Sequence, residues 1–337
     1  MSKKTIAILT SGGDSPGMNA AVWASVKSAY AHDMTILGVN RGYQGLIDGD
    51  LHPITPNDLS RILNRGGTML KTARCLKMKT EEGRAEAVAM ACKYNLDGLI
   101  VVGGDGSYQG AAILAQRGIP TICLPGTIDN DLAYTDLTLG YDTCCNTAYQ
   151  ATLKIKDTME SHERVGIVEV MGRYCGDIAL NVGLTLGAEY VLVPEANYTE
   201  EFDITNLADR LLNLKAKGRS TFLILLAEGV CFNNPHRAYT LRVKLEAELK
   251  RRGAFIGDIR ESVLGYQQRG GQPSVNDIRL GVQMANHAVV LLDQGIGNRA
   301  VGIKDNKIID MDICEALTVP RVFNRAMYDL VNKLAEQ

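Results

Sequence analysis

The sequence lacks three features that would assign it to a particular class of protein. There is no excess of one charge, because 36 lysines and arginines stand against 38 aspartates and glutamates, for a formal net charge of -2 at pH 7. This excludes the strongly basic surface typical of nucleic-acid-binding proteins. Residues 1–10 hold two lysines and only a short apolar run. We therefore expect neither a signal peptide nor a membrane span there. We expect the protein to be cytoplasmic.

The chain also lacks any Cys-x-x-Cys pair, although it contains eight cysteines. Disulfides and a zinc site are therefore not expected. Cys123 lies in an apolar run, and Cys92 and Cys314 lie in helix-like stretches, where a thiol is usually a small core residue. The five histidines are scattered. His162 alone is near other charged residues, and we expect it to be structural or solvated.

The remaining composition is that of an ordinary globular protein, with 46% hydrophobic and 22% charged residues. A length of 337 residues is enough for about two domains. Strand-like and helix-like stretches alternate, which predicts an α/β protein with two doubly wound, mainly parallel sheets covered by helices on both faces. We expect one domain from residues 1–140 plus about 267–317, and a second from about 141–266 plus 318–337.

Periodicity and turn residues locate the elements. Strands are expected at residues 4–10, 35–40, 99–102, 121–124, 165–170, 190–193, 221–226 and 262–265, and helices at 18–30, 57–63, 107–116, 146–161, 176–186, 204–217, 239–252, 275–294 and 320–335. We interpret residues 41–45 and 64–68 as loops, and Asp305 and Asn306 as the turn of a hairpin.

Two aspartates follow the apolar run 121–124. If the chain stays extended, Asp129 and Asp131 point to the same side, so one could take a proton while the other holds a cation. Their loop leaves the carboxyl end of a predicted parallel strand, where open α/β sheets bind ligands. Proline, glycine, asparagine and aspartate are also common turn residues, so this stretch alone leaves an ordinary surface loop open.

A glycine-rich turn with another aspartate follows the run 99–102. Residues 103–107 read Gly-Gly-Asp-Gly-Ser and open a helix, so backbone N–H groups and the positive end of the helix dipole can face an anion. Asp105 adds the hard oxygen ligand that magnesium prefers beside phosphate. Two acid-bearing loops after two strands predict one shared phosphate and metal site.

Three other stretches could contact anions. Residues 11–17 form a glycine turn between a strand and a helix, but the glycine spacing differs from Gly-x-Gly-x-x-Gly and disfavours a dinucleotide site. Arg173 directly follows a predicted strand, where a guanidinium group can contact an anion. Arg74 lies in a polar stretch, either as a solvated charge or as a phosphate contact.

Taken in order, these motifs resemble the bacterial ATP-dependent 6-phosphofructokinases. The resemblance covers nearly the whole chain and rests on residues 11–19, 103–107, 125–131, 171–173 and 268–271. It implies a phosphofructokinase-like fold with Rossmann-type layers. It also implies transfer of the γ-phosphoryl group of ATP to the C1 hydroxyl of fructose 6-phosphate, with Mg²⁺, as the committed step of glycolysis.

The resemblance implies roles at the nucleotide. ATP would be held by Gly12, Arg74, Cys75, Gly104, Asp105, Gly106 and Ser107. Asp105 would hold magnesium, with Asp131 as a helper. Thr127, Ile128 and Asp129 would face the sugar, and Asp129 would be the general base, with Thr127 and Arg173 completing the catalytic set.

The resemblance also implies roles at the sugar phosphate. Glu228 would accept hydrogen bonds from sugar hydroxyls, and the other contacts would be Met171, Gly172, Arg173, Tyr266, Gln267 and Gln268. Arg164, Arg260 and Arg269 would hold the 6-phosphate. Because Arg164 and Arg260 would come from a neighbouring subunit, the resemblance implies a homo-oligomer, most simply a tetramer. The alternative for each arginine is a surface ion pair.

Side-chain size at two positions indicates which phosphoryl donor the protein uses. Pyrophosphate-using relatives carry aspartate at the position of Gly106 and lysine at that of Gly126, which would crowd the α-phosphate of a nucleotide. Both residues are glycine here, so we expect ATP.

The sequence departs from the family pattern at four positions. Tyr266 replaces a usual histidine, Trp23 an arginine, Arg61 an acid and Thr221 a histidine. The last three belong to the expected effector pocket, whose remaining residues are Lys27, Lys156, Glu189, Lys217 and Arg219. We expect Trp23 to pack at a subunit contact and regulation to be weak or altered.

Two alternatives stay open. One is a pyrophosphate-dependent or mixed-donor phosphofructokinase. The other, from a different class, is a non-catalytic regulatory subunit that binds sugar phosphate. NAD kinases and lipid kinases share a Gly-Gly-Asp-Gly loop but lack partners such as residues 125–131 and 171–173.

Overall fold

The chain divides into two compact units in a computed structural model that describes residues 3–197, 204–230 and 234–335. The first unit comprises residues 1–143 and 269–321, and the second comprises residues 144–268 and 322–337. The chain thus leaves the first unit after Thr143, returns at Arg269, and leaves it again after Arg321. No helix among the described residues is long and apolar enough to cross a membrane.

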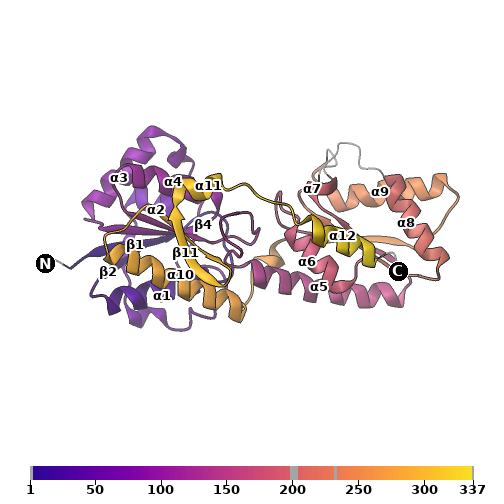
Figure 1. Ribbon diagram of the computed structural model, residues 1–337, viewed down its shortest axis with the longest axis horizontal. Helices are drawn as coiled ribbons and strands as arrows, with labels where there is room; N and C mark the ends of the chain where they lie inside the picture. Colours follow the sequence, from indigo (N-terminus) through magenta and orange to yellow (C-terminus); the bar gives the residue numbers. More distant parts are fainter. Residues whose placement is uncertain (1–2, 198–203, 231–233, 336–337) are drawn as a thin grey trace. The chain divides into compact units, whose positions relative to one another are not determined.

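A seven-stranded sheet forms the centre of the first unit (Figure 1). Its order is β11-β10-β5-β4-β1-β2-β3, and the pairs β2–β3 and β10–β11 are antiparallel while the other pairs are parallel. The strands are β1 (Thr5–Thr10), β2 (Thr35–Val39), β3 (Leu51–Pro53), β4 (Gly98–Gly103), β5 (Thr121–Pro125), β10 (Arg299–Lys304) and β11 (Lys307–Asp312). β4 and β5 are buried along their whole length. Their continuous apolar sequences are typical of central strands in a parallel sheet.

Helices cover both faces of this sheet. α1 (Met18–Ala31) and α10 (Val275–Asp293) lie side by side on one face (Figure 1). The other face packs on α2 (Gly42–Asp48), α3 (Glu81–Lys93), α4 (Asp105–Gln116) and α11 (Ile313–Thr318). Short 3-10 helices are η1 (Pro56–Leu59) and η2 (Leu76–Lys79). Each face of the sheet has its own apolar core. Because these cores hold the strands in place, the loops that follow the strands start from fixed positions.

The second unit has a four-stranded parallel sheet of order β7-β8-β6-β9. The strands are β6 (Val165–Val170), β7 (Tyr190–Leu192), β8 (Phe222–Ala227) and β9 (Ile259–Val263). The other elements are α5 (Tyr141–Ser161), which begins before the chain leaves the first unit, α6 (Asp177–Leu186), α7 (Pro194–Asn197), α8 (Ile204–Ala216), α9 (Arg237–Arg251), η3 (Gly265–Gln268) and α12 (Arg325–Leu334). Two mainly parallel sheets confirm the predicted fold class.

Several predicted elements were wrong. The loop expected at residues 41–45 is the start of α2. The helix expected at residues 320–335 begins only at Arg325, as α12, and α11 precedes it at residues where no helix was predicted. Gly45 explains the first error, because its added Cβ would lie 1.6 Å from the Asn40 carbonyl oxygen, so this glycine serves helix packing rather than a turn. Cys123 is buried as expected, whereas Cys92 and Cys314 are exposed.

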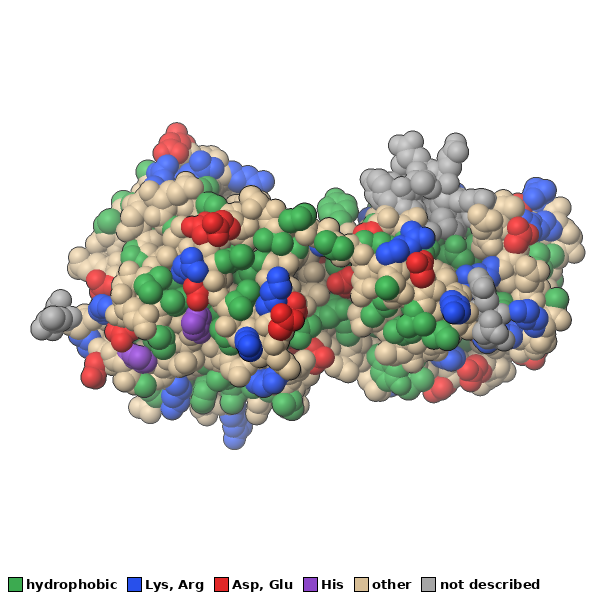
Figure 2. Space-filling view, in the orientation of Figure 1, with side chains coloured by type: hydrophobic (Ala, Val, Ile, Leu, Met, Phe, Trp, Pro, Cys, Tyr) green, Lys and Arg blue, Asp and Glu red, His purple; other side chains and the backbone are tan. Residues whose placement is uncertain are grey.

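Charged side chains of both signs are interspersed over the visible surface (Figure 2), in keeping with the net charge of -2. His162 is exposed, and its Nδ1 lies 2.9 Å from the Thr158 carbonyl oxygen within α5. It is thus solvated, as predicted.

Candidate functional site

Three loops meet at the carboxyl end of the first unit's sheet, where β1, β4 and β5 are parallel neighbours. These loops are residues 11–17, 104–107 and 126–131. The Ser11 N–H donates to the Val102 carbonyl at 2.9 Å, and the Gly126 N–H donates to the Gly103 carbonyl at 3.0 Å. The strand order reverses between β1 and β4. Such a reversal opens the crevice in which α/β sheets bind ligands.

The loops approach closely, and position 103 has no room for a side chain. An added Cβ on Gly103 would lie 2.5 Å from the Ser107 Oγ and 2.6 Å from the Ser11 carbonyl oxygen. An added Cβ on Gly104 would lie 3.6 Å from the Thr127 Cβ. The loop that carries Asp105 therefore lies beside the loop that carries Asp129.

Asp105 is exposed at the first residue of α4, where the Gln109 Nε2 donates to its Oδ2 at 3.0 Å. The space beside it is open, because nothing lies within 4 Å of an added Cβ on Gly106. Within the described ranges, no three His, Cys, Asp or Glu side chains are grouped to hold a metal ion. Magnesium usually takes one or two carboxylates and completes its shell with phosphate and water. An exposed Asp105 beside a helix N-terminus fits that kind of site.

Asp129 is only 2% exposed, and its N–H donates to the Thr127 Oγ1 at 3.2 Å. The next residue, Asn130, has a left-handed backbone with φ 51°, and its Oδ1 accepts the Thr138 N–H at 3.1 Å. The chain is therefore not extended here, so the shared orientation expected for Asp129 and Asp131 does not follow. Ile128 is fully buried, so the predicted sugar contact of Ile128 is not supported by its exposure.

Packing of the protein itself explains why residue 126 is glycine, independently of which phosphoryl donor binds. An added Cβ would lie 2.8 Å from the Val102 Cγ1 and 3.0 Å from the Met18 Cε. A side chain at this position therefore meets the protein itself. The open space beside Gly106 remains the better indicator of room for a nucleotide.

The first glycine turn is tied to the segment that carries Arg74 and Cys75. The Thr72 Oγ1 donates to the Gly12 carbonyl at 2.7 Å. Arg74 is exposed, whereas Cys75 is partly buried, with its Sγ 3.5 Å from the Gln44 Oε1. The expected nucleotide residues thus belong to one neighbourhood of the first unit.

Arg269 lies against the same glycine turn. Its Nη1 donates to the Asp14 carbonyl at 3.1 Å, and an added Cβ on Gly13 would lie 2.6 Å from that Nη1. A guanidinium group is therefore fixed beside Gly13. Its contact with a sugar phosphate stays a prediction.

In the second unit, Glu228 organises the loop after β6. One carboxylate oxygen, Oε1, accepts the N–H groups of Gly172 at 3.1 Å and Arg173 at 2.7 Å. Gly172 has φ 137° and Arg173 has φ 52°, so both residues adopt a left-handed backbone. Such a conformation is costly for arginine and persists where neighbouring contacts impose it. Glu228 thus fixes the backbone that presents the exposed Arg173 side chain.

Gln268 is fully buried, and both ends of its amide are used inside the protein. Its Oε1 accepts the Met171 N–H at 2.9 Å, and its Nε2 lies 3.2 Å from the Cys144 Sγ. The prediction of Gln268 as a direct sugar contact is not supported by this burial, because its side chain supports the Met171 backbone instead. Tyr266 is 86% exposed and Gln267 is exposed, so both can meet a ligand.

A small pocket of about 70 Å³ lies beside this loop and is lined by Glu169, Val170, Met171, Glu228, Val263, Gly265 and Tyr266. Glu169 is not among the residues predicted for the site. Its carboxylate is buried in β6 and accepts the Ala238 N–H at 3.0 Å. Burial raises the pKa of Glu169, although the Ala238 hydrogen bond and Arg237 oppose this. Its position inside an apolar strand gave no catalytic signal.

Arg164 and Arg260 lie at the opposite end of the second unit's sheet from Glu228. Arg164 directly precedes β6, and Arg260 is the second residue of β9, paired with Gly166. Glu228 directly follows β8, parallel to β6. β6 has six residues, so its two ends are about 17 Å apart at the usual strand rise. Within the second unit, these arginines therefore lie at the end of the sheet away from Glu228.

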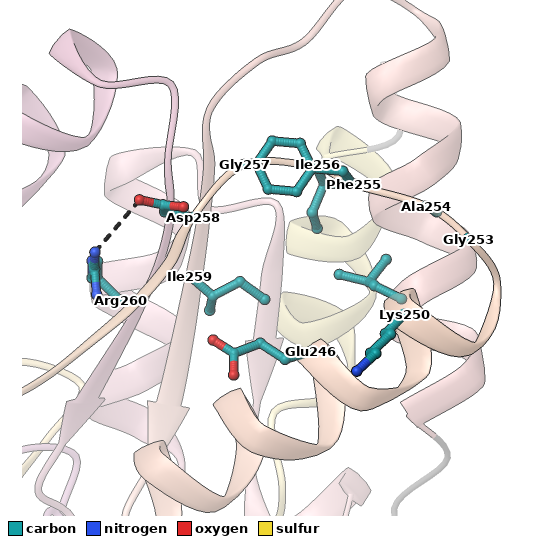
Figure 3. Close-up of a pocket in the computed structure, with 11 residues that line it drawn as sticks. Glu246, Lys250, Gly253, Ala254, Phe255, Ile256, Gly257, Asp258, Ile259 and Arg260 are labelled. Carbon is teal, nitrogen blue, oxygen red and sulfur yellow. Dashed lines mark hydrogen bonds and ion pairs between the residues drawn. The ribbon is translucent and has the colours of Figure 1, made fainter.

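Arg260 borders a larger pocket of about 430 Å³ between the end of α9 and the start of β9 (Figure 3). Its guanidinium group pairs with Asp258 at 3.4 Å, and both side chains are more than half exposed. An ion pair this exposed contributes little to stability, so Arg260 can exchange Asp258 for another anion at small cost.

The expected effector residues are only partly together. In the second unit, Glu189 is buried, and its carboxylate pairs with Arg219 at 2.6 Å and accepts the Leu223 N–H at 2.6 Å. Lys156 donates to the Leu186 carbonyl at 3.1 Å, and Lys217 lies at the end of α8. Lys27 belongs to the first unit, where its Nζ lies 5.9 Å from the centre of the Trp23 ring. This cation–π contact occupies the lysine with the indole.

Comparison with known proteins gives a consistent result. Residues 5–292 match the protein family described as Phosphofructokinase. The chain is 48% identical over 332 residues to an ATP-dependent 6-phosphofructokinase of Clostridioides difficile. The aligned residues cover 98% of this chain and 99% of the relative. A phosphofructokinase structure from Saccharomyces cerevisiae has 31% identity and a TM-score of 0.85, covering 99% of this chain and 47% of the yeast chain. A pyrophosphate-dependent phosphofructokinase structure from Marinobacter aquaeolei shares the fold, with 20% identity, a TM-score of 0.80, and coverage of 94% of this chain and 84% of that one.

Proposed function

The chain belongs to the phosphofructokinase family, and from this premise we propose that it transfers the γ-phosphoryl group of ATP to the C1 hydroxyl of fructose 6-phosphate. The products are fructose 1,6-bisphosphate and ADP. The observation that supports this most directly is that the loops carrying Asp105 and Asp129 leave adjacent parallel strands and are joined by the hydrogen bond from the Gly126 N–H to the Gly103 carbonyl.

The nucleotide phosphates would lie over the glycine turns of the first unit. Backbone N–H groups at the start of α4 face the phosphates, and the open side of Gly106 gives them room. Asp105 would hold Mg²⁺, which when bound neutralises phosphate charge. Arg74 and Cys75 would flank the nucleotide, held near Gly12 by Thr72.

Asp129 would act as the general base. As the C1 oxygen bonds to the γ-phosphorus, its proton passes to the Asp129 carboxylate, and the bond from phosphorus to the β,γ-bridging oxygen breaks to release ADP. Thr127 lies two residues earlier and orients this loop, because its Oγ1 accepts the Asp129 N–H. Burial of Asp129 limits competition from water for the proton.

Arg173 would stabilise the negative charge that develops on the transferred group. Its backbone is fixed by Glu228, so less ordering of the loop backbone is required when substrate binds. The second oxygen of Glu228 and the exposed Tyr266 and Gln267 would contact the sugar. Arg269 would contact the 6-phosphate.

Arg164 and Arg260 would complete the phosphate site of a neighbouring subunit. Their place at the far end of the second unit's sheet from Glu228 supports this role. A symmetric homo-oligomer, which we propose is a tetramer, then carries sites built from two copies of the chain. We also propose that effector control is weak, because Trp23 engages Lys27.

Purified protein tests the proposal with fructose 6-phosphate, Mg²⁺ and either ATP or pyrophosphate. We expect fructose 1,6-bisphosphate with ATP and at least a hundredfold lower rate with pyrophosphate. Equal or faster turnover with pyrophosphate would favour the pyrophosphate-dependent alternative. No product with either donor would favour the non-catalytic subunit that binds sugar phosphate.

A further inference from the structure

A fully buried carboxylate, Asp277 in the first turn of α10, holds a distant segment of the first unit. Its Oδ1 accepts the Gly140 N–H at 2.8 Å, and its Oδ2 accepts the Thr143 N–H at 2.8 Å and the Thr143 Oγ1–H at 2.5 Å. Both oxygens are thus used by residues more than 130 positions away in the chain. The segment they hold ends at Thr143, where the chain leaves the first unit.

The same segment supports the proposed catalytic loop. The Leu139 N–H donates to the Pro125 carbonyl at 2.7 Å, and Leu139 forms a β-bridge with Gly126. One residue earlier, the Thr138 N–H donates to the Asn130 Oδ1 at 3.1 Å. Residues 138–143 therefore join both ends of the loop that contains Asp129 to Asp277.

Gly140 extends this support to the first glycine turn. It has φ 101°, and an added Cβ would lie 2.7 Å from the Ser15 Cβ and 3.0 Å from the Pro16 Cδ. The Asp277 backbone also lies beside this turn, because its carbonyl oxygen would be 3.3 Å from an added Cβ on Gly17. A single carboxylate thus lies behind both loops proposed to face the nucleotide and the sugar.

We propose that Asp277 is a positioning residue for phosphoryl transfer, because its carboxylate fixes residues 138–143 and, through them, the loop 126–131. Its role in turnover rests on the proposed function. Burial raises the pKa of Asp277, and the hydrogen bonds from Thr143 and Gly140 oppose that rise. Asp277 itself is fully buried and does not touch the substrate.

The test is Asp277→Asn, which keeps the shape but has one oxygen instead of two. Its NH₂ group must then face the N–H of either Gly140 or Thr143, so at least one charge-assisted hydrogen bond is lost. We expect kcat to fall at least about tenfold while the KM for ATP changes less than about threefold. Amide hydrogen exchange should become faster in residues 126–143.

The matched control is Asp312→Asn. Asp312 is also in the first unit and accepts two backbone N–H groups, those of Cys314 and Glu315, at the start of α11. We expect this variant to keep wild-type kcat and wild-type exchange in residues 126–143. If Asp277→Asn does not fold, Thr143→Val keeps the Thr143 N–H bond to Asp277 and removes the hydroxyl, which donates to Asp277 and accepts the Ser274 N–H at 2.9 Å. This variant should change kcat and exchange in the same direction.

Wild-type kcat with unchanged exchange in residues 126–143 of the Asp277 variant would overturn the proposal, as would an equal effect in the Asp312 control. The exchange comparison stays decisive even if the wild-type protein makes no fructose 1,6-bisphosphate. In that case the proposed function fails, while faster exchange in residues 126–143 would still support positioning by Asp277.

Discussion

Arg260 and Asp129 should complement each other when they are supplied by different copies of the chain. The perturbation is a pair of variants, Asp129→Ser, which removes the base, and Arg260→Ser, which removes a phosphate contact. Because Arg260 lies at the end of the second unit's sheet away from Glu228, about 17 Å by the rise of six residues, we expect it to serve a neighbour's site.

The size of the effect follows from counting. If subunits mix at random in equal amounts, half carry an intact Asp129 and half of their neighbours carry an intact Arg260, so about one site in four is fully wild type. Losing the base should cost about 10²–10⁴-fold. Losing one charge-assisted phosphate contact should cost about tenfold or more in kcat/KM. Mixed oligomers at low fructose 6-phosphate should then reach roughly a quarter of wild-type activity.

The assay is coupled detection of fructose 1,6-bisphosphate after co-expression of the two variants with distinct affinity tags and purification on both tags in turn. Each variant treated alone in the same way is the control. Activity equal to the mean of the two single variants would refute the sharing of Arg260 between subunits.

Three further predictions concern the donor, the Arg173 loop and pH. Gly106→Asp should fold normally, since nothing lies within 4 Å of its added Cβ, and should lower kcat/KM for ATP at least tenfold; unchanged ATP kinetics would show that this space does not serve the nucleotide. Glu228→Gln keeps an oxygen that can accept the Gly172 and Arg173 N–H groups but loses the negative charge that strengthens these hydrogen bonds, so kcat/KM should fall roughly tenfold, which corresponds to about 1–2 kcal/mol of activation free energy. Glu228→Ala should lower kcat/KM further, and an alanine variant as active as the glutamine variant would exclude the loop-fixing role. Burial raises the pKa of Glu169, so the folded state binds the Glu169 proton more tightly than the unfolded state does. The contribution of this proton to folding stability is therefore lost as pH rises from the unfolded pKa of about 4.3 through the raised pKa of the folded state. Glu169→Gln should therefore gain stability relative to wild type over that window in urea unfolding, and a constant difference from pH 4 to pH 8 would contradict the direction of the shift.

Much of the site could be predicted because parallel strands bring distant loops to one edge. The apolar runs ending at Val102 and Leu124 are adjacent strands, so the aspartates beyond them had to lie near each other. Left-handed Asn130 could not be anticipated from spacing, since its conformation depends on a bond to Thr138. The condition of an extended chain, on which the shared orientation of Asp129 and Asp131 depended, is not met for that reason.

Residues that act through long-range contacts gave no sequence signal. Asp277 reads as the ordinary acidic residue of a helix's first turn, and its partners Gly140 and Thr143 lie far away in the chain. Gln268 stood inside a recognisable motif, but only packing shows that its side chain supports Met171. Glycine was ambiguous as well, because at position 45 it permits close helix packing rather than a turn.

The most direct test of the central claim is a double-mutant comparison of Asp105→Asn, Asp129→Asn and both together, measured as kcat for fructose 1,6-bisphosphate formation at saturating ATP and Mg²⁺. If the two carboxylates act on one transferring phosphoryl group, each single change should lower kcat at least a hundredfold, and the double variant should be no more than about tenfold below the weaker single variant. Losses that multiply in the double variant, or near wild-type turnover of either single variant, would contradict a shared site.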